Sequence, residues 1–95
     1  MRRYEVMVVA DPEADEEKVG QLVDRITKVL SDHQGEVKNV DRWGRRKLAF
    51  ELDKKTEGYY FVLAFMAETP ALAELDRVLS LADEVMRFKI VRTAA

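Results

Sequence analysis

Alternating apolar residues mark four predicted strands along this chain. Residues 2–10 are apolar on both faces of an extended strand, with many β-branched side chains. The two faces consist of Tyr4, Val6 and Val8 on one side and Met7 and Val9 on the other. The same pattern predicts a second strand that begins at 37–40 and continues through 48–52, beyond a bulge or bend at Gly44. Two further strands are predicted at 59–67 and 85–91.

Two other segments have apolar residues at helical spacing. The stripe of the first helix is Val19, Leu22, Val23, Ile26, Val29 and Leu30. Asp15 is its predicted N-cap, and Gly35 is predicted to end it in the left-handed conformation. The stripe of the second helix is Leu72, Leu75, Val78 and Leu79. Thr69 is its predicted N-cap, and Pro70 takes the first helical position.

The element order βαββαβ predicts an α+β fold. Right-handed crossovers turn this order into a ferredoxin-like split βαβ, with a four-stranded antiparallel sheet of order 4-1-3-2 and two helices on one face. The length suits a single domain over residues 1–95. The sequence has no cysteine and shows neither a membrane-spanning run nor a signal-peptide pattern, so the cytoplasm is the expected location.

Helices on one face of the sheet leave the other face uncovered. Alternation predicts that the helices cover Val6, Val8, Phe61, Leu63, Phe65, Phe88 and Ile90. It predicts that the outward set on the two central strands is Met7, Val9, Tyr60, Val62 and Met66. A contiguous apolar patch of this kind is either a partner interface or a surface that the chain's own loops shield.

Charge is distributed unevenly along the chain, although the formal net charge is only −2. Residues 42–55 carry six basic and two acidic side chains, whereas residues 11–24 carry six acidic side chains and one basic one. Such an asymmetry orients a protein on a polyanion even when its net charge is close to zero.

The cations of the 45–47 run suit contacts with phosphate groups. Arg45, Arg46 and Lys47 have the required chemistry, and Trp43 beside them is suited to stacking on an unpaired base. The alternative is that the cations protect an edge strand from aggregation and that Trp43 packs at a corner of the sheet. A second basic group favours function, because the first and last strands are neighbours in this fold. Its members are Arg2, Arg3, Arg87, Lys89 and Arg92.

Two other functions have less support from the residues. Segment 57–62 matches the third-strand signature of RNA-recognition-motif domains only in part, and alternation places Phe61 in the core, away from any base. For catalysis, the only histidine is His33, which is expected at the surface or at a helix end. No nucleophile elbow and no glycine-rich phosphate loop occur in the sequence. The carboxylates at 11–17 suit a helix start better than a metal site.

Four short motifs, taken in order, resemble the family of the bacterial small-ribosomal-subunit protein number six. They are the first strand Met1–Met7, the glycine-and-basic signature Gly44–Phe50, the third-strand start Gly58–Tyr60 and the apolar-then-basic ending Val85–Arg92. The resemblance covers nearly the whole chain. Two departures are Phe50, where the family usually has tyrosine, and Glu51, where proline is common.

The resemblance implies a non-enzymatic role in the small ribosomal subunit. Such proteins bind the central domain of small-subunit ribosomal RNA together with small-subunit protein eighteen, and no cofactor, metal, membrane or small-molecule substrate is expected. Cooperation with a partner is expected because a mixed-charge domain alone binds RNA weakly. The alternatives are an autonomous single-strand RNA binder of the recognition-motif type and a regulatory domain that dimerises or holds a small ligand.

Strand parity and charge, combined with this resemblance, nominate individual residues. The expected RNA contacts are Arg2, Arg3, Arg46, Lys47, Lys54, Arg87, Lys89 and Arg92. The expected contacts with the protein partner are Met7, Tyr60, Val62 and Met66.

Overall fold

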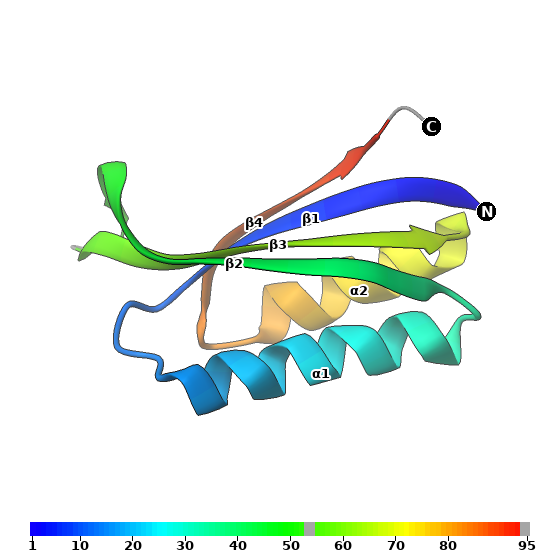
Figure 1. Cartoon of the computed structure of the whole chain (residues 1–95), viewed down its shortest axis with the longest axis horizontal. Helices are drawn as coiled ribbons and strands as arrows, with labels where there is room; N and C mark the ends of the chain where they lie inside the picture. The colour runs from blue at the N-terminus through cyan, green and yellow to red at the C-terminus, as the bar shows by residue number, and fades with distance from the viewer. Residues whose placement is uncertain (53–54, 94–95) are drawn as a thin grey trace.

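The computed structural model describes residues 1–52 and 55–93, with the side chains of 49–52 and 55 left out. Its elements are β1 (Arg2–Ala10), α1 (Glu16–Asp32), β2 (Glu36–Leu52), β3 (Lys55–Ala67), α2 (Thr69–Leu81) and β4 (Val85–Arg92). The strand pairs are antiparallel in the order β2-β3-β1-β4, which is the predicted order read from the other edge. Both helices cover one face of the sheet (Figure 1). The predicted ferredoxin-like α+β fold is confirmed.

The core lies between the sheet and the helix layer. The helices contribute Val19, Leu22, Val23, Ile26 and Leu30 from α1 and Ala71, Leu75 and Leu79 from α2. On the sheet, Val8 lies opposite Phe61 on one side and Phe88 on the other, so alternation directs all three to the helices. Phe88 is only partly buried, because β4 is an edge strand. The predicted helix-facing set is confirmed.

Only the N-terminal end of α1 agrees with the prediction. Asp15 is the N-cap as predicted, because its carboxylate accepts a hydrogen bond from the Lys18 amide at 2.8 Å. The prediction of a left-handed Gly35 is wrong, since Gln34 takes that conformation with φ 64°. Gly35 is instead required by close approach: a Cβ there would lie 3.0 Å from carbonyl oxygens of both α1 and β3.

The start of α2 lies one residue earlier than predicted. Thr69 already belongs to the helix, and the N-cap is Glu68, whose backbone is extended and whose side chain makes no capping hydrogen bond. The predicted cap by Thr69 is therefore wrong. Pro70 does lie in the first turn, where its fixed φ suits the helix and its missing amide is not needed.

β2 and β3 form a longer hairpin than the sequence predicted. The predicted start of the third strand at residue 59 is wrong, because β3 already begins at Lys55. The predicted irregularity at Gly44 is confirmed by its φ of 81° and by a register shift between Arg42 and Gly44. Trp43 is thus the extra residue of a β-bulge. Beyond the bulge, β2 curls away from the helix layer (Figure 1).

A polar cluster ties the β2–β3 hairpin to the start of α1. The Glu16 carboxylate accepts hydrogen bonds from the Tyr59 hydroxyl at 3.1 Å and from the Arg42 guanidinium at 3.0 Å. Burial raises the pKa of the Tyr59 hydroxyl, and the hydrogen bond to Glu16 raises that pKa further. The folded state therefore favours the neutral, hydrogen-bonded form of Tyr59.

Replacing Tyr59 with phenylalanine should lower the free energy of unfolding by about 1 kcal/mol at neutral pH, because one hydrogen bond to a carboxylate is lost. The raised folded-state pKa adds a pH effect: the stabilisation is complete below the unfolded-state pKa and is lost as the pH rises through the folded-state value. The variant should lack this alkaline loss. Urea unfolding at neutral pH and above about pH 10 measures both effects.

The matched control for this experiment is Tyr4→Phe. Tyr4 is also buried and its ring stacks on Phe65, but its hydroxyl has no hydrogen-bond partner among the described residues. An equal loss of stability in both variants would contradict the role of the Glu16 hydrogen bond.

Candidate protein and nucleic-acid interface

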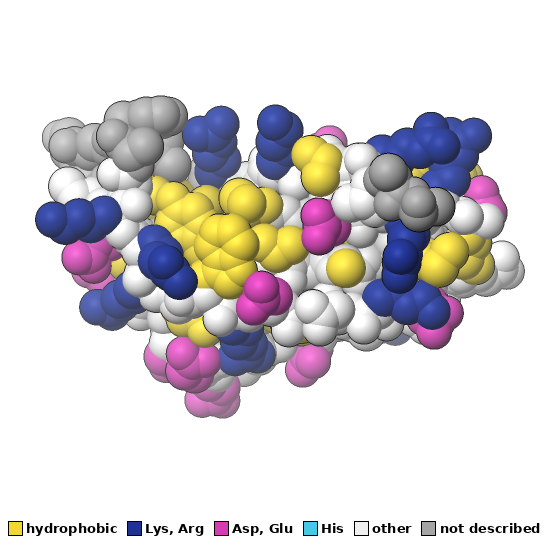
Figure 2. All heavy atoms as spheres, turned by 45° about the horizontal axis from the view of Figure 1, so that its top comes forward, with side chains coloured by type: hydrophobic (Ala, Val, Ile, Leu, Met, Phe, Trp, Pro, Cys, Tyr) yellow, Lys and Arg dark blue, Asp and Glu magenta, His cyan; other side chains and the backbone are white. Residues whose placement is uncertain are grey.

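The face of the sheet that points away from the helices is apolar and open. Met7, Val91 and Trp43 have 37%, 39% and 40% of their surface exposed. Figure 2 shows the apolar side chains of this face as a patch bordered by basic and acidic side chains. Val9 faces the same way but is buried, because it packs directly against the backbone of Gly58. The predicted outward orientation is confirmed, and the described part of the chain does not shield the patch.

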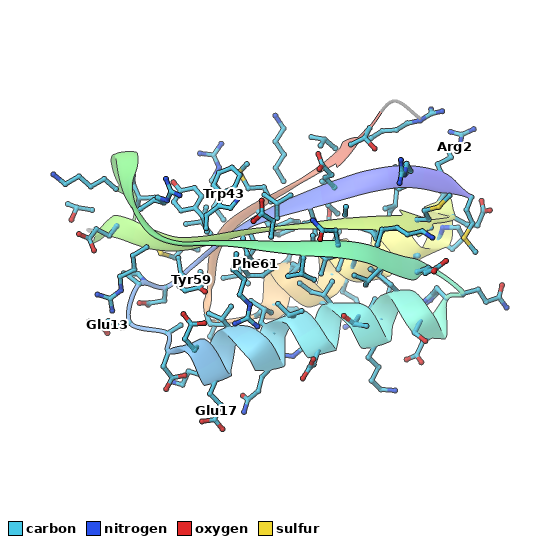
Figure 3. All side chains as sticks on the ribbon, viewed as in Figure 1. Arg2, Glu13, Glu17, Trp43, Tyr59 and Phe61 are labelled. Atoms are coloured by element: carbon cyan, nitrogen blue, oxygen red, sulfur yellow. The ribbon has the colours of Figure 1, made fainter. Side chains whose placement is uncertain are left out.

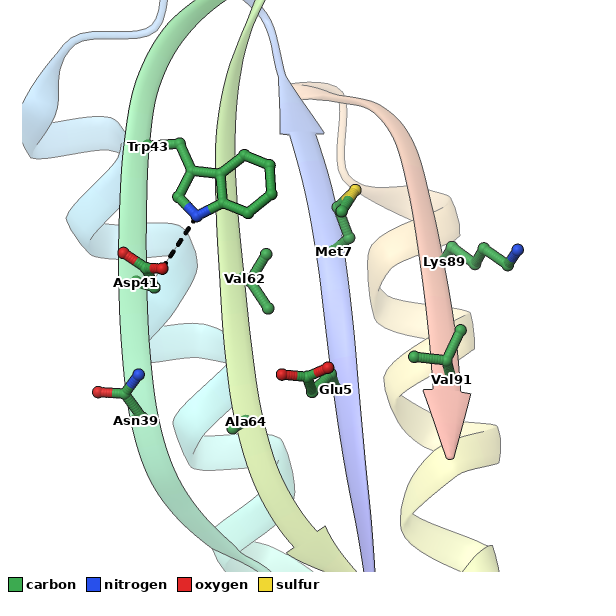
Figure 4. Close-up of a pocket in the computed structure, with 9 residues that line it drawn as sticks. All are labelled: Glu5, Met7, Asn39, Asp41, Trp43, Val62, Ala64, Lys89 and Val91. Atoms are coloured by element: carbon green, nitrogen blue, oxygen red, sulfur yellow. Dashed lines mark hydrogen bonds between the residues drawn. The ribbon is translucent and has the colours of Figure 1, made fainter. Parts of the chain in front are cut away.

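A hollow of about 460 Å³ lies in the middle of this open face and spans all four strands (Figure 4). Its lining comprises Asn39, Asp41 and Trp43 of β2, Val62 and Ala64 of β3, Glu5 and Met7 of β1, and Lys89 and Val91 of β4. The floor is largely apolar. The carboxylates of Glu5 and Asp41 lie on either side of β3, while the Lys89 side chain extends away from the sheet (Figure 4).

Trp43 forms one end of the hollow and is held by three neighbours. Its ring stacks on Tyr60 with the centroids 6.2 Å apart and the planes inclined by 11°. Its Nε1–H donates a hydrogen bond to Asp41 Oδ2 at 3.0 Å. The Arg46 guanidinium carbon lies 6.0 Å from the ring centroid, within the range of a cation–π contact. The register of β2 and β3 places Trp43 beside Tyr60, because Arg42 pairs with Phe61 and Gly44 pairs with Tyr60.

The predicted partner-binding residues coincide only in part with the hollow. Met7 and Val62 line it, and Tyr60 contributes through its stack on Trp43. Met66 does not line it, because it lies near the opposite end of β3, across from Arg3. These four side chains therefore share a face but not one site.

Seven of the nine lining residues are missing from the predicted partner set, and one of the seven, Lys89, is instead in the predicted RNA-contacting set. Glu5 and Val91 have the correct strand parity, and alternation alone could have added them. Asp41 and Trp43 were harder to find, because β2 carries irregularities on both sides of Asp41 and the sequence signalled only the one at Gly44. Trp43 was noted as a stacking residue but was not assigned to the partner surface.

The predicted RNA-contacting cations lie in two groups. One group lies on β1 and on the neighbouring edge strand β4, and it consists of Arg2, Arg3, Arg87, Lys89 and Arg92. The other consists of Arg46 and Lys47 on β2 beyond the bulge, opposite Gly58 and Glu57. Arg2 and Trp43 lie towards opposite ends of the sheet in Figure 3. Lys54 lies outside the described residues, as do the side chains of Phe50 and Glu51.

The cations predicted to contact RNA differ in their ion pairing from most of the others, although Lys18 and Arg45 also have no carboxylate partner among the described residues. All seven that are described are exposed, and none has a carboxylate within salt-bridge distance among the described residues. By contrast, five cations outside that set are paired with carboxylates: Arg25, Lys28, Lys38, Arg42 and Arg77. Cations without an internal partner can make charge-assisted hydrogen bonds to an external phosphate.

Other chemistry is not indicated by the geometry. Across residues 1–52 and 55–93, no group of three or more His, Cys, Asp or Glu side chains is placed to hold a metal ion. No helix in the same ranges is long and apolar enough to cross a membrane. The fold and its open face define a small α+β protein with an uncovered apolar sheet surface.

Comparison with known proteins identifies the family. The model of the family described as ribosomal protein S6 matches residues 3–92. Small ribosomal subunit protein bS6 of Cutibacterium acnes is 44% identical over 92 residues, 97% of this chain and 96% of that protein. The protein of the same name from Corynebacterium kroppenstedtii is 43% identical over 95 residues, the full length of both. The chain belongs to the ribosomal protein S6 family.

A solved structure supports this assignment at the level of the fold. The crystal structure of 30S ribosomal protein S6 from Thermotoga maritima matches this chain with a TM-score of 0.89 and 33% identity. The match covers 97% of this chain and 87% of the other. Family membership confirms the expectation of a structural protein of the small ribosomal subunit, in a family not known for enzymes. The roles of individual residues remain predictions.

The stack of Trp43 on Tyr60 should be measurable as an energetic coupling. Trp43→Ala and Tyr60→Ala are each expected to destabilise the protein. The double variant should lose about 1 kcal/mol less than the sum of the two, since stacked aromatic pairs contribute about 0.5–1.5 kcal/mol beyond buried area. Urea unfolding of the four proteins gives the coupling energy. Additive losses would show that the ring stack contributes nothing to stability.

Proposed function

We propose that this small-subunit protein binds the central domain of small-subunit ribosomal RNA cooperatively with small-subunit protein eighteen. In this proposal the exposed cations contact RNA phosphates and the open face of the sheet contacts the protein partner. The RNA-contacting residues are Arg2, Arg3, Arg46, Lys47, Lys54, Arg87, Lys89 and Arg92. The partner-contacting residues are Met7, Tyr60, Val62 and Met66, to which Trp43 and Val91 are added.

The observation that carries the proposal is the separation of charge types on the surface. The described cations of the RNA set have no carboxylate partner among the described residues. Figure 2 shows basic side chains bordering the apolar patch. The patch itself contains the carboxylates of Glu5 and Asp41, which repel phosphate. The surface is therefore suited to two ligands, with RNA at the rim and a protein over the middle.

Cooperation follows from the number and spread of the cations. RNA affinity depends largely on how many phosphates are neutralised together, and this chain divides its cations between two edges of the sheet. A partner that covers the open face adds positive charge between these groups and buries exposed apolar area. Both effects give the complex of the two proteins a higher affinity for RNA than either protein has alone.

The two alternatives are less well supported. An autonomous single-strand RNA binder of the recognition-motif type requires Tyr60 or Phe61 to be exposed on the third strand. Phe61 is fully buried, and Tyr60 is half-buried and stacks on Trp43. A regulatory domain that dimerises through the same face predicts a stable homodimer. Analytical ultracentrifugation of the purified chain tests that alternative directly.

The proposal predicts weak RNA binding by the chain alone and tight binding with protein eighteen present. Affinity for a central-domain RNA fragment should be measured at several fixed salt concentrations. Arg87→Ala should weaken binding of the heterodimer uniformly across duplex sequences and reduce the salt slope by about one, because a phosphate contact carries little sequence information.

Lys28→Ala is the control for Arg87→Ala, since it removes the same charge from the exposed surface of α1. It should leave RNA affinity nearly unchanged. Tight RNA binding by the chain alone would favour the autonomous alternative. Absence of binding even with protein eighteen would contradict the proposed function.

A further inference from the structure

We propose that the hollow on the open face receives a basic side chain of the protein partner, arginine in preference to lysine, between the carboxylates of Glu5 and Asp41. The inference rests on the proposed function, since it requires that a protein covers this face. It goes further by stating the chemistry of the partner's contact segment: an apolar strip that carries one central cation.

The shape of the hollow suits such a segment. Its floor of Met7, Val62 and Ala64 is apolar and lies across the two central strands (Figure 4). Arginine and lysine side chains pack their aliphatic stems on surfaces of this kind while the charged head reaches a polar group. The volume of about 460 Å³ leaves room for apolar neighbours of that side chain as well.

The charges of the hollow are uncompensated within the described chain. Neither Glu5 nor Asp41 forms an ion pair with a described residue. Lys89, the cation in the lining, extends away from both carboxylates (Figure 4). Glu5 is partly buried and Asp41 is exposed. Burying an unpaired carboxylate costs considerable free energy, so any partner that covers both must supply a counter-charge.

Trp43 favours arginine among the possible cations. Its Nε1–H binds one oxygen of Asp41, which orients that carboxylate and leaves its remaining lone pairs available. A guanidinium can donate a forked pair of hydrogen bonds to a carboxylate and can also stack on an aromatic ring.

RNA is a poor occupant of the same hollow. Phosphates would approach two carboxylates with no cation between them, and the repulsion would be strongest where the face is least hydrated. A basic protein segment instead meets carboxylates of opposite charge and an apolar floor. Both the electrostatic and the apolar interaction favour its binding. Charge complementarity therefore selects a basic protein segment for the hollow and leaves RNA to the rim.

The test is calorimetric titration of the full chain with small-subunit protein eighteen. Glu5→Gln and Asp41→Asn, on different strands, should each weaken binding about tenfold, as expected for loss of a hydrogen bond between charged groups. The matched control is Asp24→Asn, which removes the same charge from an exposed position of α1 and should change affinity less than about twofold. Urea unfolding confirms that all variants are folded.

Salt dependence provides a second readout. Binding of the unaltered chain should weaken with added KCl more steeply than binding of the Glu5→Gln, Asp41→Asn double variant. Emission from Trp43, the single tryptophan of the chain, should change on binding, because its ring forms one end of the hollow.

The outcomes separate this inference from the proposed function. If the unaltered chain does not bind protein eighteen, both are wrong. If it binds and the two hollow variants match Asp24→Asn, the proposed function stands and the cation in the hollow is wrong. If Glu5→Gln leaves protein binding intact but tightens binding of the RNA fragment, RNA covers the hollow and the inference is overturned.

Discussion

The structure depends on one constraint: a sheet with both helices on one side exposes every second residue of its central strands on the other. β1 and β3 are apolar on both faces, so packing against the helices buries only about half of their apolar side chains. The remaining half forms the open face. The same two strands therefore supply side chains to both the core and the open face. A one-residue shift in the register of either strand would turn its core-facing side chains to the open face and its open-face side chains to the core.

Trp43, the extra residue of the bulge at Gly44, connects the open face to the basic part of the hairpin. Its indole stacks on Tyr60, donates a hydrogen bond to Asp41 and lies under Arg46. Bulges increase strand twist, which agrees with the curl of β2 away from the helices beyond this point (Figure 1).

Ion pairing distinguishes structural charges from those free to meet a ligand. Paired cations such as Arg42 and Arg25 join α1 to other parts of the fold, whereas the cations around the open face have no described carboxylate partner. Glu5 and Asp41 on the open face likewise have no ion-pair partner among the described residues. A near-neutral chain can therefore present basic and acidic surface regions together, as the proposed function requires.

The sequence by itself determined the element order, the strand order and the set of residues facing the helices, because alternation and helical spacing are local properties. It also indicated the bulge at Gly44 and the S6 family, through short motifs in order. Tertiary structure decided how β2 registers with β3, and so that Trp43 and Asp41 reach the hollow while Met66 does not. It also decided that Gln34 is left-handed and that Gly35 is needed for close approach. Register, helix ends and ion pairs depend on partners far apart in the chain, which local patterns do not specify.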